Sequence, residues 1–282
     1  MSETGILMLR KKGGDFVNHM TQAMRELHQM DELSSMDSAI HRCHPLAKLL
    51  VTIVYIFTVA SFSRYDLTGL IPMLFYPMLL FAVSGISVRL CFYKLRFILP
   101  LVCAVGIWNP FLDRTAVLTV GNVVVTGGMI SFVTLMLKGI YALMASFLLI
   151  ATTSIEKICH ALRMLHLPEF LATQVLMTYR YISLMLQEAG TMMNAYMLRA
   201  PGQKGIHFSA WGSFAGQLLL RSMDRAQELY QSMQMRGFHG MFYYADMERF
   251  RLRDAGYLAF WFLIFLFLRF FDLSELIGGM LL

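Results

Sequence analysis

The stretch Gln217-Leu-Leu-Leu-Arg-Ser-Met-Asp-Arg-Ala-Gln-Glu-Leu-Tyr-Gln-Ser-Met-Gln-Met-Arg-Gly-Phe238 has the residue pattern of an amphipathic helix. Apolar side chains recur at helical spacing along one stripe, and polar side chains occupy the other side. The apolar stripe consists of Leu219, Met223, Ala226, Tyr230 and Met233, and the polar side of Arg221, Asp224, Arg225, Glu228 and Ser232. The sequence therefore predicts one helix here with a charged face of its own.

The end of this helix is predicted as clearly as its faces. Gly237 can adopt the left-handed conformation that closes a helix, with Phe238 packing back on Met233 in a Schellman motif. Arg236 then projects from the last turn. A simple role for this arginine is to complement the negative end of the helix dipole, which contributes about 0.3–1 kcal/mol.

A second predicted helix, residues 188–199, also ends just after an arginine. Pro201 prevents the helix from continuing and directs Ala200 towards extended geometry. Two helices thus each present one cation, Arg199 and Arg236. This pairing favours docking to two equivalent partner surfaces over a role for each arginine in its own helix alone.

The composition places the chain in a lipid bilayer. Of its 282 residues 57% are hydrophobic and only 15% are charged, which excludes an ordinary soluble domain. The net charge of +6 comes from basic residues that lie between and beside the apolar segments. Such a distribution is typical of membrane topology and argues against a nucleic-acid partner.

The predicted fold class is all-α, a polytopic helical membrane protein with about five transmembrane helices and a cytoplasmic insertion of coupling helices. The expected spans are 46–62, 67–85, 97–112, 129–152 and 257–271. The expected division is a cytoplasmic segment 1–45, helices one to four in 46–152, the coupling region 153–254, and a last helix with its tail in 255–282. Eleven Lys or Arg residues between Ser154 and Asp254 predict that this region is cytoplasmic. The alternation of Lys and Arg content between successive loops predicts an inner-membrane protein with a cytoplasmic N-terminus.

Several local features leave alternatives open. The run 117–126, rich in β-branched residues, predicts either a small hairpin or a loop. Thr153-Ser-Ile-Glu156 matches a capping box at the start of a helix. Lys138 lies inside the fourth span, where a lysine is a functional candidate, although snorkelling or a contact with a neighbouring helix is the favoured interpretation.

The chemistry of a self-contained enzyme or metal protein is missing from the sequence. The four cysteines are isolated, and His41-Arg-Cys-His44 lacks partners at ligand spacing, so no metal site is predicted. No phosphate-binding loop is found, and the chain is not expected to hydrolyse ATP itself. The coupling region, residues 153–254, is instead rich in methionine. This indicates either an adaptable binding surface or a loosely packed core.

The arginine-ended helices, the segment 218–238 and the segment from His44 to Leu50 resemble the transmembrane T component of energy-coupling factor (ECF) importers, especially the CbiQ-like cobalt branch. The resemblance implies two ABC-type ATPase partners, which carry ATP and Mg, and a CbiM-like substrate-binding S component in the membrane. It also implies that short Ala-Arg-Gly-like motifs dock in the ATPases. By resemblance these are Leu198-Arg199-Ala200 and Met235-Arg236-Gly237, in which Leu198 and Met235 replace alanine and Ala200 replaces glycine.

The expected function is therefore that of a non-catalytic coupling subunit, which binds no cofactor itself and serves cobalt uptake, with nickel or a vitamin as the alternative substrate. Arg221, Asp224, Arg225 and Glu228 are expected to support the second coupling helix. The alternatives are a self-contained channel or secondary carrier and, third, a membrane enzyme. The enzyme would require clustered carboxylates or histidines, whereas His160, His166, His207 and His239 are scattered.

Overall fold

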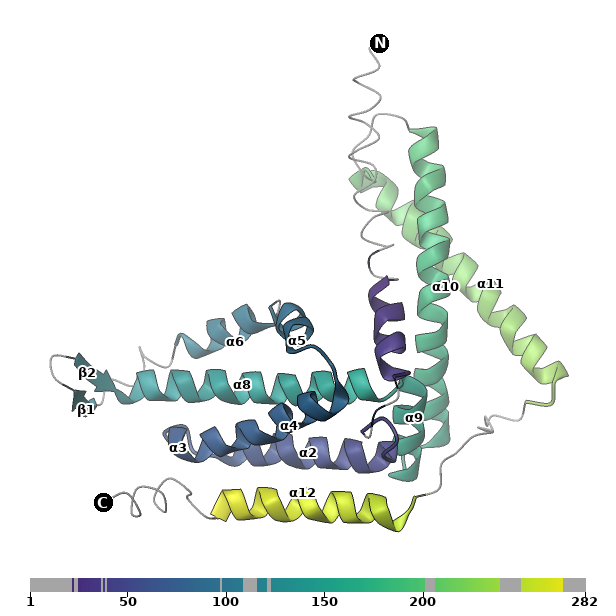
Figure 1. Ribbon diagram of the computed structural model, residues 1–282. Coiled ribbons are helices and arrows are strands. Elements are labelled where there is room, and N and C mark those ends of the chain that lie inside the picture. Colours follow the sequence, from purple (N-terminus) through teal and green to yellow (C-terminus); the bar gives the residue numbers. More distant parts are fainter. Residues whose placement is uncertain are drawn as a thin grey trace. The chain divides into compact units, whose positions relative to one another are not determined.

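The computed structural model describes residues 22, 25–36, 38, 40–96, 98–108, 116–120, 123–200, 206–238 and 250–270. The chain divides into two compact units, each drawn in Figure 1. We call Leu33–Ala161 with Met247–Leu282 the bundle unit, and Met1–Glu32 with Leu162–Asp246 the platform unit. The expected divisions at residues 45, 152 and 254 stay predictions.

The bundle unit is built from helices, as the sequence predicts. Its elements are α2 (Pro45–Ser61), α3 (Leu67–Leu70), the 3₁₀ turn η1 (Ile71–Leu74), α4 (Phe75–Ser84), α5 (Val88–Leu95), α6 (Leu99–Gly106), β1 (Ala116–Val120), β2 (Val123–Thr126), α8 (Gly127–Thr152) and α12 (Leu252–Phe270). Helix α9 (Ile155–Met164) crosses the boundary between the units. Two helical stretches, Leu67–Ser84 and Gly127–Thr152, are long and apolar enough to cross a membrane. The number of crossings remains a prediction.

The start of α2 is tied to the start of α12. The Nδ1 atom of His44 caps α2 by accepting a hydrogen bond from the backbone N–H of Leu46 at 3.2 Å. Asp254, itself buried, accepts hydrogen bonds at 3.0 Å from the backbone N–H groups of His44 and Arg251. One carboxylate therefore satisfies donors from two segments that lie 210 residues apart along the chain.

The second predicted span is one helical rod with a local change of winding. Pro72 lacks an amide hydrogen, and the chain winds into the 3₁₀ turn η1 around it before α4 continues. The rod ends at Gly85, whose φ of 71° is the left-handed geometry of a helix C-terminus. The expected start of this span at residue 67 is confirmed, since α3 begins at Leu67.

The structure decides two of the open local questions. The hairpin is confirmed and the loop is not, because β1 and β2 pair antiparallel with Val120 opposite Val123. The capping box is wrong: α9 begins at Ile155, one residue later than the box requires, and the buried hydroxyl of Thr153 has no hydrogen-bond partner. Ser154 therefore occupies the cap position, and the residue three positions on is Lys157 rather than a glutamate.

Close packing joins α6 to α8. A Cβ atom on Gly139 of α8 would lie 2.9 Å from Val102, and one on Gly106 of α6 would lie 2.9 Å from Phe132. Small residues at these two crossing points let the helix backbones approach each other, as is common between membrane helices.

An aromatic cluster forms the centre of the bundle unit. Tyr55 of α2, Tyr76 of α4 and Trp261 and Phe265 of α12 are all buried. The ring centroids of Tyr55 and Tyr76 are 4.5 Å apart, and those of Tyr76 and Trp261 are 4.7 Å apart in an edge-on arrangement. The hydroxyl of Tyr55 donates to the Met73 carbonyl at 3.0 Å, so the polar end of this buried ring is satisfied. Three helices thus share one core.

Lys138 closes the C-terminal end of α2. Its Nζ atom donates to the carbonyls of Phe62 at 2.6 Å and Ala60 at 3.2 Å, and Arg269 of α12 donates to the carbonyl of Ser61 between them. The last carbonyls of a helix have no partner within the helix, and cations from neighbouring elements satisfy them here. The favoured interpretation of Lys138, a contact with a neighbouring helix, is confirmed.

We expect Lys138→Met to lower the free energy of unfolding by about 1–3 kcal/mol, because two carbonyls lose their donor. Lys138→Arg keeps a cation at the position and should retain most of this stability. Chemical unfolding of the purified protein in detergent, followed by tryptophan fluorescence, measures the difference. Equal stability of Lys138→Met and the wild type would contradict the capping role.

Candidate docking site

The platform unit contains both predicted coupling helices. Helix α10 (Glu169–Arg199) begins after Pro168 and ends on Arg199, and α11 (Trp211–Met235) follows the short 3₁₀ turn η2 (Phe208–Ala210) and ends directly before Arg236. The expected helix ends are therefore confirmed, while Pro201 lies outside the described residues. Figure 1 shows α11 crossing α10, with the C-terminal ends of the two helices at separate corners of the crossed pair.

The cap of α11 has the predicted Schellman geometry. Gly237 has a φ of 77°, its N–H donates to the Gln234 carbonyl at 2.9 Å, and the N–H of Phe238 donates to the Met233 carbonyl at 3.0 Å. These two bonds hold the backbone on both sides of Arg236. The direction in which this arginine leaves the helix is therefore set by the cap.

Each arginine is exposed next to a large exposed apolar residue. Leu198 is 83% exposed and Met235 is 90% exposed, and both are larger than the alanine of the resembling motif. The sequence marks them only as departures from that motif. The structure adds that each helix end offers one cation beside one apolar side chain, a combination suited to a partner groove with an apolar wall and a hydrogen-bond acceptor.

Gly237 is the position where the cap depends on residue type. Nothing lies within 4 Å of a Cβ atom placed there, so the cost of Gly237→Ala comes from the positive φ alone, about 1–2 kcal/mol. We expect the amides of residues 236–238 to exchange with solvent about five- to thirtyfold faster in this variant.

Gly216→Ala is a matched control for this prediction, since Gly216 lies within α11 and its added Cβ also meets nothing within 4 Å. Alanine favours a helix interior, so this change should slow exchange in α11. Hydrogen–deuterium exchange mass spectrometry measures both. Equal exchange in the wild type and Gly237→Ala would show that the cap does not depend on glycine.

The side chains of α11 that pack inward lie, except at Met233, one position before the apolar stripe identified in the sequence. The half-buried side chains are those of Phe214, Leu218, Ser222, Leu229 and Met233, whereas Leu219, Met223, Ala226 and Tyr230 are exposed. The cause is the run Leu218-Leu-Leu220, which supports two adjacent apolar stripes, so that periodicity alone does not select between them. The consequence is an exposed apolar face, with Leu219 60% exposed.

The four supporting residues meet in one polar groove between α10 and α11. Arg221, Asp224, Arg225 and Glu228 line a space of ≈ 220 Å³ together with Leu184, Met185 and Glu188 of α10. Arg221 pairs with Glu188, and Arg225 approaches Glu228 to 3.3 Å. All four paired side chains are well exposed, so each pair contributes at most about 1 kcal/mol. The sequence shows Glu188 at the start of the second segment but does not indicate its partner.

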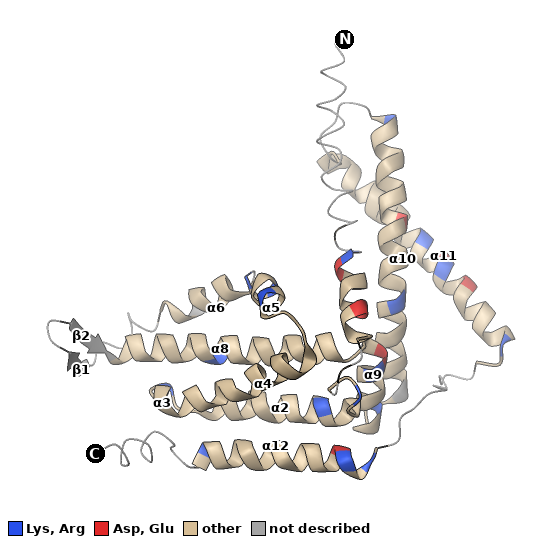
Figure 2. Cartoon of the chain, in the orientation of Figure 1, with Lys and Arg blue, Asp and Glu red and all other residues tan. Residues whose placement is uncertain are grey.

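The methionines divide between the core and the surface, and a binding role for the exposed ones stays a prediction. Met193 of α10 is fully buried, whereas Met223 and Met235 of α11 are exposed. Met241 and Met247 lie outside the described residues. Figure 2 shows how the charges are distributed along α10 and α11, with Lys or Arg at the C-terminal end of both helices.

The histidine and cysteine cluster near residue 41 does not converge on one point. The ring of His41 contacts the Ser38 hydroxyl at 2.7 Å and the Leu33 carbonyl at 3.1 Å, while the Nδ1 atom of His44 serves the cap of α2. Burial lowers the pKa of His41, which keeps the imidazole neutral. Within the described part of the chain, no group of three or more His, Cys, Asp or Glu residues is arranged to hold a metal ion.

Comparison with known proteins adds independent findings. The model of the family described as cobalt transport protein, CbiQ, matches residues 36–244. The energy-coupling factor transporter transmembrane protein EcfT of Thermosediminibacter oceani is 25% identical over 238 residues, 79% of this chain and 89% of that protein. A protein of Lactiplantibacillus plantarum named nickel permease LarQ is 31% identical over 108 residues, 38% of this chain and 39% of that protein.

An uncharacterised protein of Methanocaldococcus jannaschii is 27% identical over 148 residues, 51% of this chain and 50% of that protein. The chain therefore spans half or less of the length of the Methanocaldococcus jannaschii protein and of the nickel permease. The EcfT match is the one of the three that extends over most of both chains.

Proposed function

This chain belongs to the cobalt transport protein family, CbiQ, and from that membership we propose that it is the transmembrane coupling component of an ATP-driven ECF-type importer. The observation that carries the proposal is the pair of long helices that end on exposed Arg199 and Arg236, each beside an exposed apolar side chain. The match to a protein named as the transmembrane component of an energy-coupling factor transporter supports it.

The two arginines are the proposed contacts to a pair of ABC-type ATPases. Each guanidinium carries five N–H donors in a fixed plane and binds acceptors in a partner groove, while Leu198 or Met235 covers the apolar wall. When ATP and Mg bring the ATPases together, the two grooves move relative to each other and displace the ends of α10 and α11. The chain transmits this motion and performs no catalysis itself.

A substrate-binding membrane subunit is the third proposed partner. The exposed apolar face of α11, which includes Leu219, Met223 and Tyr230, fits a contact with an apolar helical surface. Because the Arg221–Glu188 pair between α11 and α10 is solvent-accessible and weak, α11 can shift along α10 without the loss of a buried ion pair.

Cobalt ion is the proposed substrate, since the family is described as cobalt transport protein. Nickel is the second candidate, which the relative named nickel permease favours. The proposed location is the cytoplasmic membrane, with several crossings, the N-terminus in the cytoplasm and the platform unit on that same side, where the ATPases have access to ATP.

Co-purification from native membranes tests the proposal. The tagged chain is extracted in mild detergent, every bound protein is identified, and ATPase activity and cobalt and nickel uptake are measured after reconstitution. An ABC-type ATPase and a small membrane protein that purify with the chain, with uptake only in their presence, are expected. Transport by the chain alone in liposomes would instead establish a self-contained channel or carrier.

A further inference from the structure

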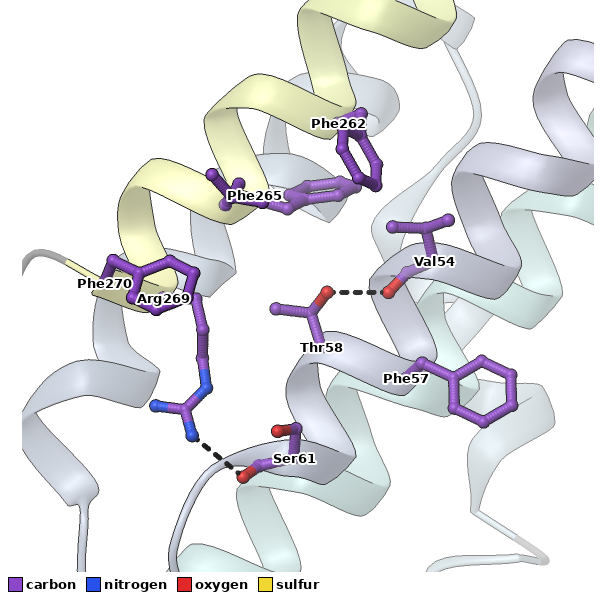
Figure 3. A pocket seen from close by; sticks show the side chains of 9 residues that line it. Val54, Phe57, Thr58, Ser61, Phe262, Phe265, Arg269 and Phe270 are labelled. Atoms are coloured by element: carbon purple, nitrogen blue, oxygen red, sulfur yellow. Dashed lines mark hydrogen bonds between the residues drawn. The ribbon is translucent and has the colours of Figure 1, made fainter.

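A groove runs between α2 and α12 near the C-terminal ends of both helices. It encloses ≈ 250 Å³, and Figure 3 shows its lining. Val54, Phe57 and Thr58 form the side on α2, and Phe262 and Phe265 form the side on α12. Arg269 closes one end. The groove has no part in the capping of α10 or α11 and is separate from the proposed docking site.

The walls of the groove are apolar. The Thr58 hydroxyl donates to the Val54 carbonyl of its own helix at 2.7 Å, and Figure 3 shows the Thr58 methyl group directed towards α12. Phe265 is buried at the base, whereas Phe57 and Phe262 are exposed at the rim. A hydrocarbon chain can therefore lie along the groove without burying an unsatisfied polar group.

The closed end of the groove is cationic. Arg269 donates from one nitrogen to the Ser61 carbonyl at 3.3 Å and stacks on Phe62 with its guanidinium carbon 4.8 Å from the ring centroid. A guanidinium has five N–H donors, so this geometry leaves donors for an anion, and Ser61 adds a hydroxyl at the same place.

Among the described residues, positive charges outnumber negative ones around this end. Lys138 reaches the same carbonyls, and Arg64 lies just beyond the end of α2 with its guanidinium over Tyr65. Asp66, which accepts from the Ser63 N–H, is the acid in this link. Among the described residues at the end of α2, three cations thus face one carboxylate.

We propose that this groove binds an anionic glycerophospholipid, with an acyl chain between α2 and α12 and the phosphate on Arg269 and Ser61. In a membrane-embedded bundle the ends of α2 and α12 lie at the level of the lipid headgroups, where a phosphate is available. A guanidinium binds phosphate oxygens through strong charge-assisted hydrogen bonds, and Arg269 supplies such donors here. The inference requires only a membrane-embedded bundle and does not depend on ATPase coupling.

Native mass spectrometry of the delipidated full-length protein tests the site, with phosphatidylglycerol and phosphatidylcholine of identical chains as probes. The wild type should bind phosphatidylglycerol about tenfold or more tightly than phosphatidylcholine, and Arg269→Gln should lose this preference. Arg64→Gln is the matched control, since it removes a cation from the same end but outside the groove. It should retain at least half of the preference.

Two further variants and one further ligand separate the contribution of the groove from that of the cation. Thr58→Phe fills the groove with Arg269 intact and should weaken both lipids, and glycerol 3-phosphate, which has no chains, should not bind. Arg269→Lys should retain part of the preference if Arg269→Gln unfolds. Equal loss in Arg269→Gln and Arg64→Gln, no difference between the two lipids, or a dimer of this chain that covers the groove would overturn the proposal.

Discussion

Arg199→Glu combined with Arg236→Glu is expected to abolish co-purification of the ATPases and ATP-driven uptake, while the protein remains inserted and folded. Each change replaces a cation at an exposed helix end with an anion, so it reverses the charge that the partner groove would meet. Loss of one partner of a buried charged contact costs about 2–5 kcal/mol. Each site alone should thus weaken binding about thirtyfold or more.

The control for the double variant has the same change in charge but leaves both helix ends unchanged. Arg180→Glu with Arg253→Glu also replaces two exposed arginines, one within α10 and one in the first turn of α12. It should retain ATPase binding and most of the uptake. Pull-down and uptake are measured in parallel, with thermal unfolding as the check on folding. Normal uptake by the Arg199/Arg236 variant would refute the docking role of the arginines.

Trp261→Ala is expected to have the largest effect on stability, about 3 kcal/mol or more. Trp261 is 3% exposed and lies within 5.5 Å, between ring centroids, of both Tyr76 and Phe265. Its removal leaves a cavity at the point where α4 and α12 meet. Because lipid is itself apolar, the loss of stability in a membrane arises from lost packing rather than from transfer to water. This keeps the expected loss near the lower limit for replacing a buried tryptophan with alanine.

Leu263→Ala is the matched control, since Leu263 is on the same helix two residues later and is 63% exposed. It should change stability by less than about 0.5 kcal/mol. Unfolding in detergent by a denaturing surfactant, monitored by near-ultraviolet circular dichroism, compares the two. Equal destabilisation by both variants would show that the aromatic cluster does not organise the bundle.

The sequence predicts the helical elements well where a breaker or cap residue is present. Gly237 predicts both the end of α11 and its hydrogen bonds, and Gly85 lies where α4 ends. The resemblance to ECF transmembrane components is confirmed by the family match over residues 36–244. The docking role of the arginines, the partners and the substrate stay predictions.

What the sequence does not predict depends on contacts between distant segments. Leu218-Leu-Leu220 permits two stripes, and only the packing of α11 on α10 exposes Leu219. The hydrogen bond from His44 to Asp254 joins residues 210 positions apart, a distance over which no periodicity carries information.

The failed prediction of the capping box has a local cause instead. Serine at 154 competes with threonine at 153 for the cap position of α9.

The arrangement at the end of α2 also has a consequence for biosynthesis. The Ala60 and Phe62 carbonyls receive their donor only once residue 138 has been synthesised, and the Ser61 carbonyl waits for a residue 208 positions later. At about 5–20 residues per second, the 208 residues up to Arg269 take roughly 10–40 seconds to synthesise. Until then the Ser61 carbonyl depends on water or lipid headgroups for its hydrogen bond. A nascent chain that stops before α12 leaves the Ser61 carbonyl without its Arg269 donor, so the end of α2 is fully capped only when the last helix has been made.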